Sequence, residues 1–128
     1  MAAVGEVMLR WGFLETVMLE KLSECKVELQ SMAPPIQRWR KAAISGSDLF
    51  KAWSHEIEHA ALTRNLLAHG LNGAHSQPNP EVTCRHADGH TKTLTYTQLL
   101  DAAQEIDLLR LRLRRETADT LRIHSTGS

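Results

Sequence analysis

Cysteine and long apolar runs are scarce in this chain, and their scarcity excludes several classes of protein. Two cysteines, Cys25 and Cys84, occur in 128 residues, and they are far apart and not spaced as metal ligands. A disulfide framework is therefore excluded, and we expect a reduced, cytoplasmic protein. No stretch of about 18 apolar residues occurs, so we expect no membrane span, and the first residues lack the pattern of a signal peptide.

An excess of charge of either sign is also absent. Fifteen Lys and Arg residues balance fifteen Asp and Glu residues, so the net charge is zero when the seven histidines are neutral. The chain therefore has no global field that attracts nucleic acid, and any contact with RNA or DNA must be local. The length and the 42% hydrophobic share predict one globular domain over residues 1–128, in which residues 125–128 form a frayed tail.

Apolar residues recur at steps of three and four along three segments, and this period predicts three long helices. We expect them over residues 4–29, from Asp48 to about His69, and from Thr95 onward, where Thr95 and Gln98 form a capping box. The expected buried stripes are Val4, Val7, Met8, Trp11, Leu14, Met18, Leu22 and Cys25 in the first of these helices, Leu49, Phe50, Trp53, Ile57, Ala60 and Ala61 in the second, and Leu99, Ala103, Ile106, Leu109 and Leu113 in the last.

Turn-forming residues divide the remainder of the chain. Pro35 suits the first turn of a short helix over residues 35–44, and Gly46 is expected to end it in a left-handed conformation. Residues 71–81 hold turn signals without periodicity and predict a surface loop, whereas residues 82–94 predict a β-hairpin. The expected fold is an all-α, up-and-down bundle of three long helices and one short helix, with a small β-hairpin inserted before the last helix.

One candidate metal site lies in the middle of the second long helix. His55, Glu56 and His59 match the His-Glu-x-x-His pattern, in which two histidines bind zinc and the glutamate activates water. A catalytic zinc site needs a third protein ligand, and Leu62 and Asn65 occupy the positions at which the common extension has glycine and histidine. We therefore expect no metal and no cofactor, and a zinc hydrolase is the weaker alternative.

A second candidate site is the run Arg-Asn-Leu-Leu-Ala-His-Gly, from Arg64 to Gly70, at the end of the same helix. His69 in a last turn and Gly70 as a left-handed stop are also expected of an ordinary helix end. Arg64, however, has no acidic partner at helical spacing, and Asn65 is a poor helix former whose amide can reach His69 one turn on. We expect Arg64 and His69 to lie outside the main apolar stripe, where Arg, Asn and His together can handle phosphate.

This run resembles the motif of HEPN domains, which pair Arg with His four to six residues later and often have Asn directly after the Arg. Residues 10–15, Arg-Trp-Gly-Phe-Leu-Glu, are similar to a stretch in the first helix of many small bacterial HEPN-like proteins. The resemblance implies a helical bundle that forms a homodimer, with two motif copies in one cleft. Many members are metal-independent ribonucleases of toxin–antitoxin or antiviral systems, and others lack this activity.

The sequence departs from the family in two places. A toxin branch has Tyr two residues after the His, where this chain has Leu71, so inactivation by modification of that Tyr does not carry over. The hairpin at residues 82–94 is also not part of the minimal four-helix fold.

RNA cleavage by its own 2′-hydroxyl needs a base, an acid and a cation. We expect His69 to be the base or acid, Arg64 to hold the phosphate and Asn65 to orient His69 or the phosphate. Arg64 and His69 are about 140° apart on an ideal helix, and one chain offers one such histidine, so a homodimer is expected to complete the site. The expected partners are an RNA substrate and an antitoxin or nucleotidyltransferase. The alternative is a non-catalytic module that binds a nucleotide, RNA or a protein partner.

Overall fold

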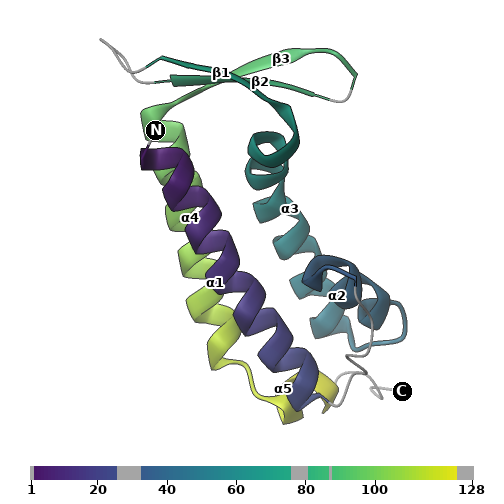
Figure 1. The fold of residues 1–128 in the computed structure, drawn as a ribbon. Helices are drawn as coiled ribbons and strands as arrows, with labels where there is room; N and C mark the ends of the chain where they lie inside the picture. The colour runs from purple at the N-terminus through teal and green to yellow at the C-terminus, as the bar shows by residue number, and fades with distance from the viewer. Residues whose placement is uncertain (1, 26–32, 76–80, 87, 124–128) are drawn as a thin grey trace.

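The computed structural model describes residues 2–25, 33–75, 81–86 and 88–123 (Figure 1). The chain is mainly helical within them, with a small antiparallel sheet before the last long helix, so the expectation of a helical fold is confirmed. No helix of the described part is long and apolar enough to cross a membrane. In chain order the elements are α1 (Ala2–Glu24), α2 (Pro35–Ile44), α3 (Asp48–Gly70), β1 (Leu71–His75), β2 (Glu81–Arg85), β3 (Thr91–Thr95), α4 (Tyr96–Arg115) and α5 (Ala118–Ile123).

The predicted helix boundaries hold closely for α2 and α3 and less closely for α1. α1 ends at Glu24, whereas the apolar period predicts a helix over residues 4–29. The end of that prediction, from residue 26, lies outside the described residues, and so does the predicted frayed tail at 125–128. The short helix α5 has too few residues to show a period, and sequence analysis missed it.

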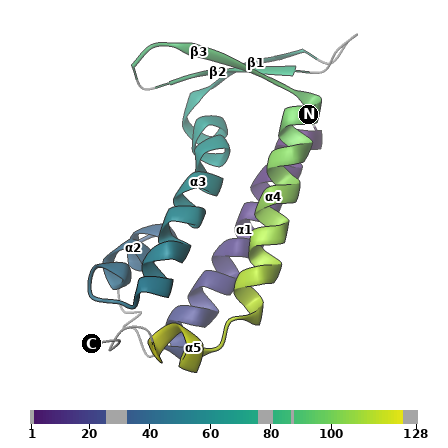
Figure 2. The same ribbon diagram turned by 180° about the vertical axis from the view of Figure 1, so that it is seen from behind.

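The three long helices run along one another, and the sheet covers one end of them (Figures 1 and 2). α1 and α4 lie side by side and both run away from the sheet, whereas α3 runs back toward it. α2 packs on the part of α3 that is far from the sheet, and α5 lies at the same end. This arrangement places the C-terminal end of α3, which carries the second candidate site, directly beneath the sheet.

Apolar side chains between these elements form one core. The stripe predicted for α4 is buried at all five positions, because the helix presents that face to α1 and α3. Burying one side chain of this kind contributes about 1.5–3 kcal/mol, so the stripe fixes which face of α4 turns inward. The largest fully buried side chains are Trp39, Leu14, Met18, Leu22, Ile57, Leu99, Ile106, Leu113, Leu121, Val7, Val82 and Cys84.

The predicted hairpin is present as β2 and β3, which pair antiparallel from Glu81–Thr95 to Arg85–Thr91. Its turn contains Gly89 with φ at 94°, in the left-handed region that glycine occupies without steric cost. Val82, Cys84 and Leu94 are buried, so the inner face of the hairpin closes the end of the helical core.

Sequence analysis was wrong about the segment before the hairpin, which it assigned to a surface loop over residues 71–81. Residues 71–75 form β1, which pairs antiparallel with the other edge of β2, and residues 76–80 lie outside the described part. The turn signal Asn72-Gly73 misled the prediction, because the ladder absorbs it as an irregularity between Leu71 and Gly73. The fold is therefore mainly helical, and the inserted element is a three-stranded sheet rather than a two-stranded hairpin.

Hydroxyl side chains cap the starts of α3, α4 and α5. Thr95 forms the predicted capping box: the Gln98 N–H donates to Thr95 Oγ1 at 3.2 Å, and the Thr95 N–H donates to Gln98 Oε1 at 2.9 Å. At the start of α3, Ser47 Oγ accepts from the Phe50 N–H at 2.9 Å and donates to the Leu121 carbonyl at 2.6 Å. The Ser47 cap therefore also ties α5 to α3.

Gly70 is needed for a reason that differs from the predicted left-handed stop. It remains helical, without a positive φ, and the backbone of Arg85 in β2 passes directly over it. A Cβ at Gly70 would lie 2.2 Å from the Arg85 carbonyl oxygen, and real Cβ atoms essentially never come within 3.0 Å of another heavy atom. Gly46 likewise has no left-handed φ, and a Cβ there would lie 2.9 Å from the Ala42 carbonyl oxygen.

Candidate functional site

The Arg64 side chain is anchored between two helices. It leaves α3 on the face that carries the buried Ile57 and Ala61, and its Cζ lies 5.7 Å from the centroid of the Trp11 ring in α1. Arg64 Nε is buried and has no hydrogen-bond partner within the described part of the chain. The expectation that Arg64 lies outside the apolar stripe is therefore wrong, because the buried face of α3 continues past Ala61 to Leu67.

The tip of the Arg64 side chain turns toward Asn65, and Nη1 donates to Asn65 Oδ1 at 3.0 Å. Asn65 and His69 are both exposed and one helical turn apart, which places their side chains on the same side of α3. Among the described contacts, the Asn65 amide oxygen is bonded to Arg64, so Asn65 orients the guanidinium. A hydrogen bond thus joins Arg64 to Asn65, and His69 follows Asn65 one turn later on the same side of the helix.

The charge of Arg64 has no carboxylate partner among the described residues. Arg10, Arg40 and Arg112 each form an ion pair with a glutamate, at 2.7 to 3.2 Å. The sequence has no acidic residue at helical spacing from Arg64, and the described part of the folded chain brings none to it from another element. A half-buried guanidinium without a carboxylate attracts an anion more strongly than a fully solvated one, because less water screens its charge.

The residues of the candidate zinc site lie on the exposed side of α3. Glu56 accepts from Arg112 Nη2 of α4 at 3.2 Å, and the same guanidinium lies over Trp53, with Cζ 5.1 Å from the ring centroid. His55 and His59 are exposed. Within the described ranges, no three His, Cys, Asp or Glu side chains come together as a metal site requires. Glu56 therefore contributes to the contact between α3 and α4, and no described residue joins His55 and His59 as a third zinc ligand.

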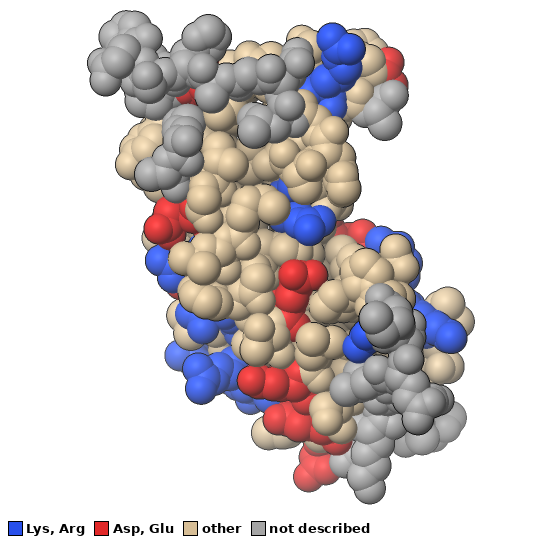
Figure 3. All heavy atoms as spheres, viewed as in Figure 1, with Lys and Arg blue, Asp and Glu red and all other residues tan. Residues whose placement is uncertain are grey.

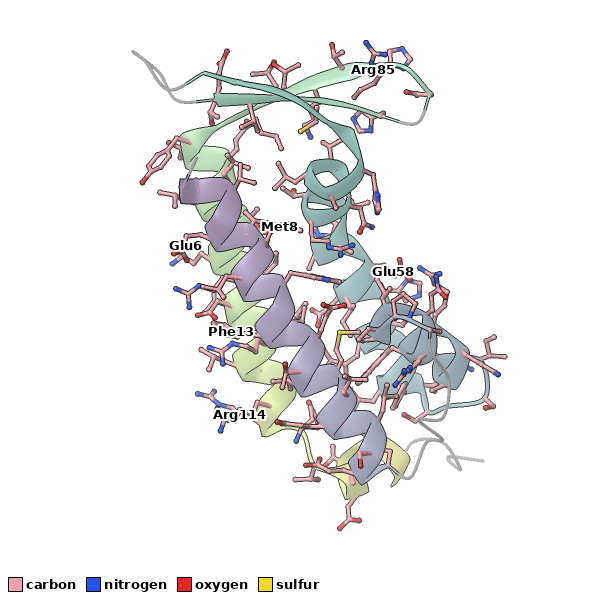
Figure 4. All side chains as sticks on the ribbon, in the orientation of Figure 1. Glu6, Met8, Phe13, Glu58, Arg85 and Arg114 are labelled. Atoms are coloured by element: carbon pink, nitrogen blue, oxygen red, sulfur yellow. The ribbon has the colours of Figure 1, made fainter. Side chains whose placement is uncertain are left out.

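The β2–β3 hairpin adds a histidine to this region that sequence analysis did not include in the site. Val82 and Cys84 face the helices, and the alternation of a strand puts Arg85 on the outer face of the sheet, where Figure 4 shows its side chain. His86 continues the same register, because its N–H donates to the His90 carbonyl at 2.7 Å. His86 therefore belongs to the side of the sheet that faces α3.

The turn next to His86 is held by a carboxylate. The His90 N–H donates to Asp88 Oδ1 at 3.0 Å, and His90 Nδ1 lies 2.9 Å from Asp88 Oδ2. These two bonds, the backbone one first, lower the pKa of Asp88 below its ordinary value, with a smaller contribution from His86. His90 is thus engaged by Asp88, and both side chains are exposed. No spacing in the sequence indicates that this turn and the end of α3 come together.

The charge on the face of Figure 3 is mixed. Basic side chains lie mainly along its two sides, and acidic side chains lie over its lower middle, so this face is not uniformly basic. Binding of an anion on this face would therefore depend on a local group of basic side chains rather than on a general positive field.

Comparison with known proteins adds no assignment to this geometry. The chain matches no protein-family model, and no curated protein and no solved structure is significantly similar to it.

Proposed function

We propose that the chain is a HEPN-like, metal-independent RNA endonuclease of toxin or defence type. Arg64 binds the scissile phosphate, Asn65 orients the Arg64 guanidinium, and His69 transfers a proton. The observation that carries this proposal is the state of Arg64, which is half-buried, stacked on Trp11, bonded to Asn65 and without a carboxylate among the described residues. A purely structural arginine in such a place would be expected to have an acidic partner.

The proposed reaction uses the 2′-hydroxyl of the RNA as nucleophile. The 2′ oxygen forms a bond to phosphorus, the bond from phosphorus to the 5′ oxygen breaks, and the products are a 2′,3′-cyclic phosphate and a 5′-hydroxyl. One group accepts the 2′-hydroxyl proton and another donates a proton to the leaving oxygen. The Arg64 guanidinium stabilises the negative charge on the phosphate, which is why no metal is needed in this scheme.

The experiment that tests the proposal is cleavage of single-stranded RNA in the presence of EDTA. His69→Ala is expected to lower the rate by about 10²- to 10⁴-fold, because it removes a proton-transfer group. Arg64→Lys is also expected to lower the rate strongly, because an ammonium group does not reproduce the two-pronged contact with phosphate. His55→Ala, an exposed histidine on the same helix, is the matched control and should cleave like the wild type.

Two results would remove the proposal. One is a wild-type protein that leaves RNA intact in EDTA over a range of substrates. The other is cleavage that persists in both His69→Ala and Arg64→Lys, which would identify a contaminating nuclease.

We also propose a homodimer, and the outer face of α4 supports it. Leu100, Leu108 and Leu111 are 38%, 54% and 39% exposed and follow one another at helical spacing. Asp101 and Arg115, both exposed, lie toward opposite ends of this stripe. Two copies of α4 that pair antiparallel, with Leu108 near the two-fold axis, would bring Asp101 of one copy next to Arg115 of the other.

Sedimentation measures this association directly. The wild type is expected to sediment at twice the 14.4 kDa chain mass at micromolar concentration, and Leu108→Glu at the chain mass. Asp101→Arg and Arg115→Asp should each weaken the dimer, and the double exchange should restore it. A wild-type protein that is monomeric at these concentrations would refute the proposed dimer, and the proposed cleavage activity would still stand.

A non-catalytic module is the second candidate, and two observations favour it. The net charge is zero, and the face in Figure 3 is mixed in charge, whereas RNA-cleaving proteins usually present more positive surface. This alternative would be established if the protein binds RNA, if binding is lost when Arg64 is replaced, and if no cleavage product forms. The proposal also includes an antitoxin or nucleotidyltransferase partner, and co-purification from the native cell tests for it. It further includes a cytoplasmic location.

A further inference from the structure

The corner between the end of α3 and the sheet holds two histidines that come from different elements. A Cβ at Gly70 would lie 2.2 Å from the Arg85 carbonyl oxygen, so the backbones of α3 and β2 touch at this point. His69 and His86 are each one residue away from the contact. The bonds on either side of this contact put the Cα atoms of Gly70 and Arg85 about 6 Å apart at most. With 3.8 Å between consecutive Cα atoms, those of His69 and His86 are then separated by roughly 14 Å at most.

The two side chains are accessible and lie on the same side of the sheet. His69 and His86 are both exposed, and strand alternation puts His86 on the face that carries the buried Cys84. Lys92 pairs with Cys84 across the ladder, is exposed, and belongs to that face as well. The corner therefore combines two imidazoles with one ammonium group, and Figure 4 shows Arg85 on the opposite face.

The other described histidines are less suited to act with His69. His90 is bonded to Asp88 by its backbone N–H and by Nδ1. His55 and His59 lie near the middle of α3, more than two turns before His69. His86 is the described histidine whose backbone position is fixed next to His69 by a direct contact between elements.

We propose that His86 is the second proton-transfer group of the reaction, and this inference rests on the proposed ribonuclease function. One of the two imidazoles, neutral, takes the proton from the 2′-hydroxyl as the 2′ oxygen bonds to phosphorus. The other, protonated, gives its proton to the 5′ oxygen as that oxygen leaves. A single chain then contains both groups, and the site does not need the His69 of a partner subunit. Lys92 contributes positive charge near the phosphate.

The test compares His86→Ala with His90→Ala in the full chain, using a single-stranded RNA in EDTA and the 2′,3′-cyclic product as readout. His86→Ala is expected to lose about 10²- to 10⁴-fold in rate, like His69→Ala, whereas His90→Ala keeps the wild-type rate. The wild-type pH profile is expected to be bell-shaped, and each single variant should lose one limb. All these side chains are exposed, so the thermal melts should stay close to that of the wild type.

A substrate with sulfur in place of the 5′ oxygen shows which histidine is the acid. A thiolate leaves without prior protonation, so this substrate restores the rate of the variant that lacks the acid and not of the variant that lacks the base. Rescue of either His69→Ala or His86→Ala, and of one only, is the expected result. This readout separates proton transfer from a general effect on folding or RNA binding.

The possible failures are distinguishable. If His69→Ala is inactive and His86→Ala cleaves at the wild-type rate, the second group is not His86, and the proposed function stands. If His86→Ala is slow on both substrates and its pH profile keeps both limbs, His86 binds RNA and transfers no proton, which also overturns the inference. A wild type without cleavage in EDTA removes the proposed function and this inference together.

Discussion

Gly70→Ala tests the close approach that positions the sheet on α3. The added Cβ would lie 2.2 Å from the carbonyl oxygen, 3.1 Å from the carbonyl carbon and 3.2 Å from the nitrogen of Arg85. All three are backbone atoms, so no side chain can rotate away, and α3 and β2 must separate by about 1 Å to reach an ordinary contact. Overpacking of this kind costs about 1–3 kcal/mol, which outweighs the ~0.5–1 kcal/mol that alanine gains over glycine in a helix.

The net expectation is a loss of about 1–2 kcal/mol in the free energy of unfolding, measured by urea denaturation. For a domain of this length, such a loss lowers Tm by roughly 5 °C. Gly12→Ala is the matched control, because a Cβ at Gly12 in α1 meets nothing within 4 Å. That variant is expected to gain about 0.5–1 kcal/mol, so the two substitutions should differ in sign.

Two results would contradict this reasoning. A Gly70→Ala protein as stable as Gly12→Ala would show that the backbones of Gly70 and Arg85 do not touch. A Gly70→Asn protein of wild-type stability would favour the left-handed stop instead, because asparagine tolerates that conformation and is too large for the contact seen here.

Three further predictions follow from local contacts. Thr95→Ala removes one half of the capping box and should cost about 1 kcal/mol in urea denaturation, whereas Thr97→Ala, exposed in the same turn, should cost little. Arg64→Met keeps an apolar side chain on Trp11 and removes the buried Nε donor that has no partner, which should stabilise the fold by about 1–3 kcal/mol. The loss of the cation–π attraction should destabilise it by about 0.5–2 kcal/mol. The Tm of this variant should therefore equal or exceed that of the wild type. Burial raises the pKa of the Cys84 thiol, so at pH 8 it should react with a thiol reagent only after unfolding.

The long helices and their buried faces were predictable from the sequence because local rules determine them. The stripe from Leu99 to Leu113 repeats at the helical period, and it is buried throughout. The Thr95 and Gln98 pair identified the start of α4 to the residue, since a capping box uses groups only three positions apart. Such signals are contained in the segment itself and need no knowledge of its neighbours.

The parts that sequence analysis missed depend on contacts between distant segments. β1 contains Asn72-Gly73, which is typical of a turn, and becomes a strand because the edge of β2 offers it a ladder. Gly70 follows the pattern of a helix stop, yet the requirement for glycine comes from Arg85, a residue of another element. The sequence indicated Arg64, Asn65 and His69 as a set, but not that Arg64 is buried against Trp11.

The parallel pairing of α1 with α4 has a consequence for how the chain folds as it is made. α1 comprises Ala2–Glu24 and its partner α4 comprises Tyr96–Arg115, so α1 is synthesised well before the helix on which it packs most. Before α4 is made, the apolar stripe of α1 lacks its largest contact and stays exposed, so it can bind other apolar surfaces in the cell. Contacts this remote in sequence also slow folding relative to bundles of neighbouring helices. Synthesis of α4, rather than formation of α1, therefore sets the moment at which the core closes.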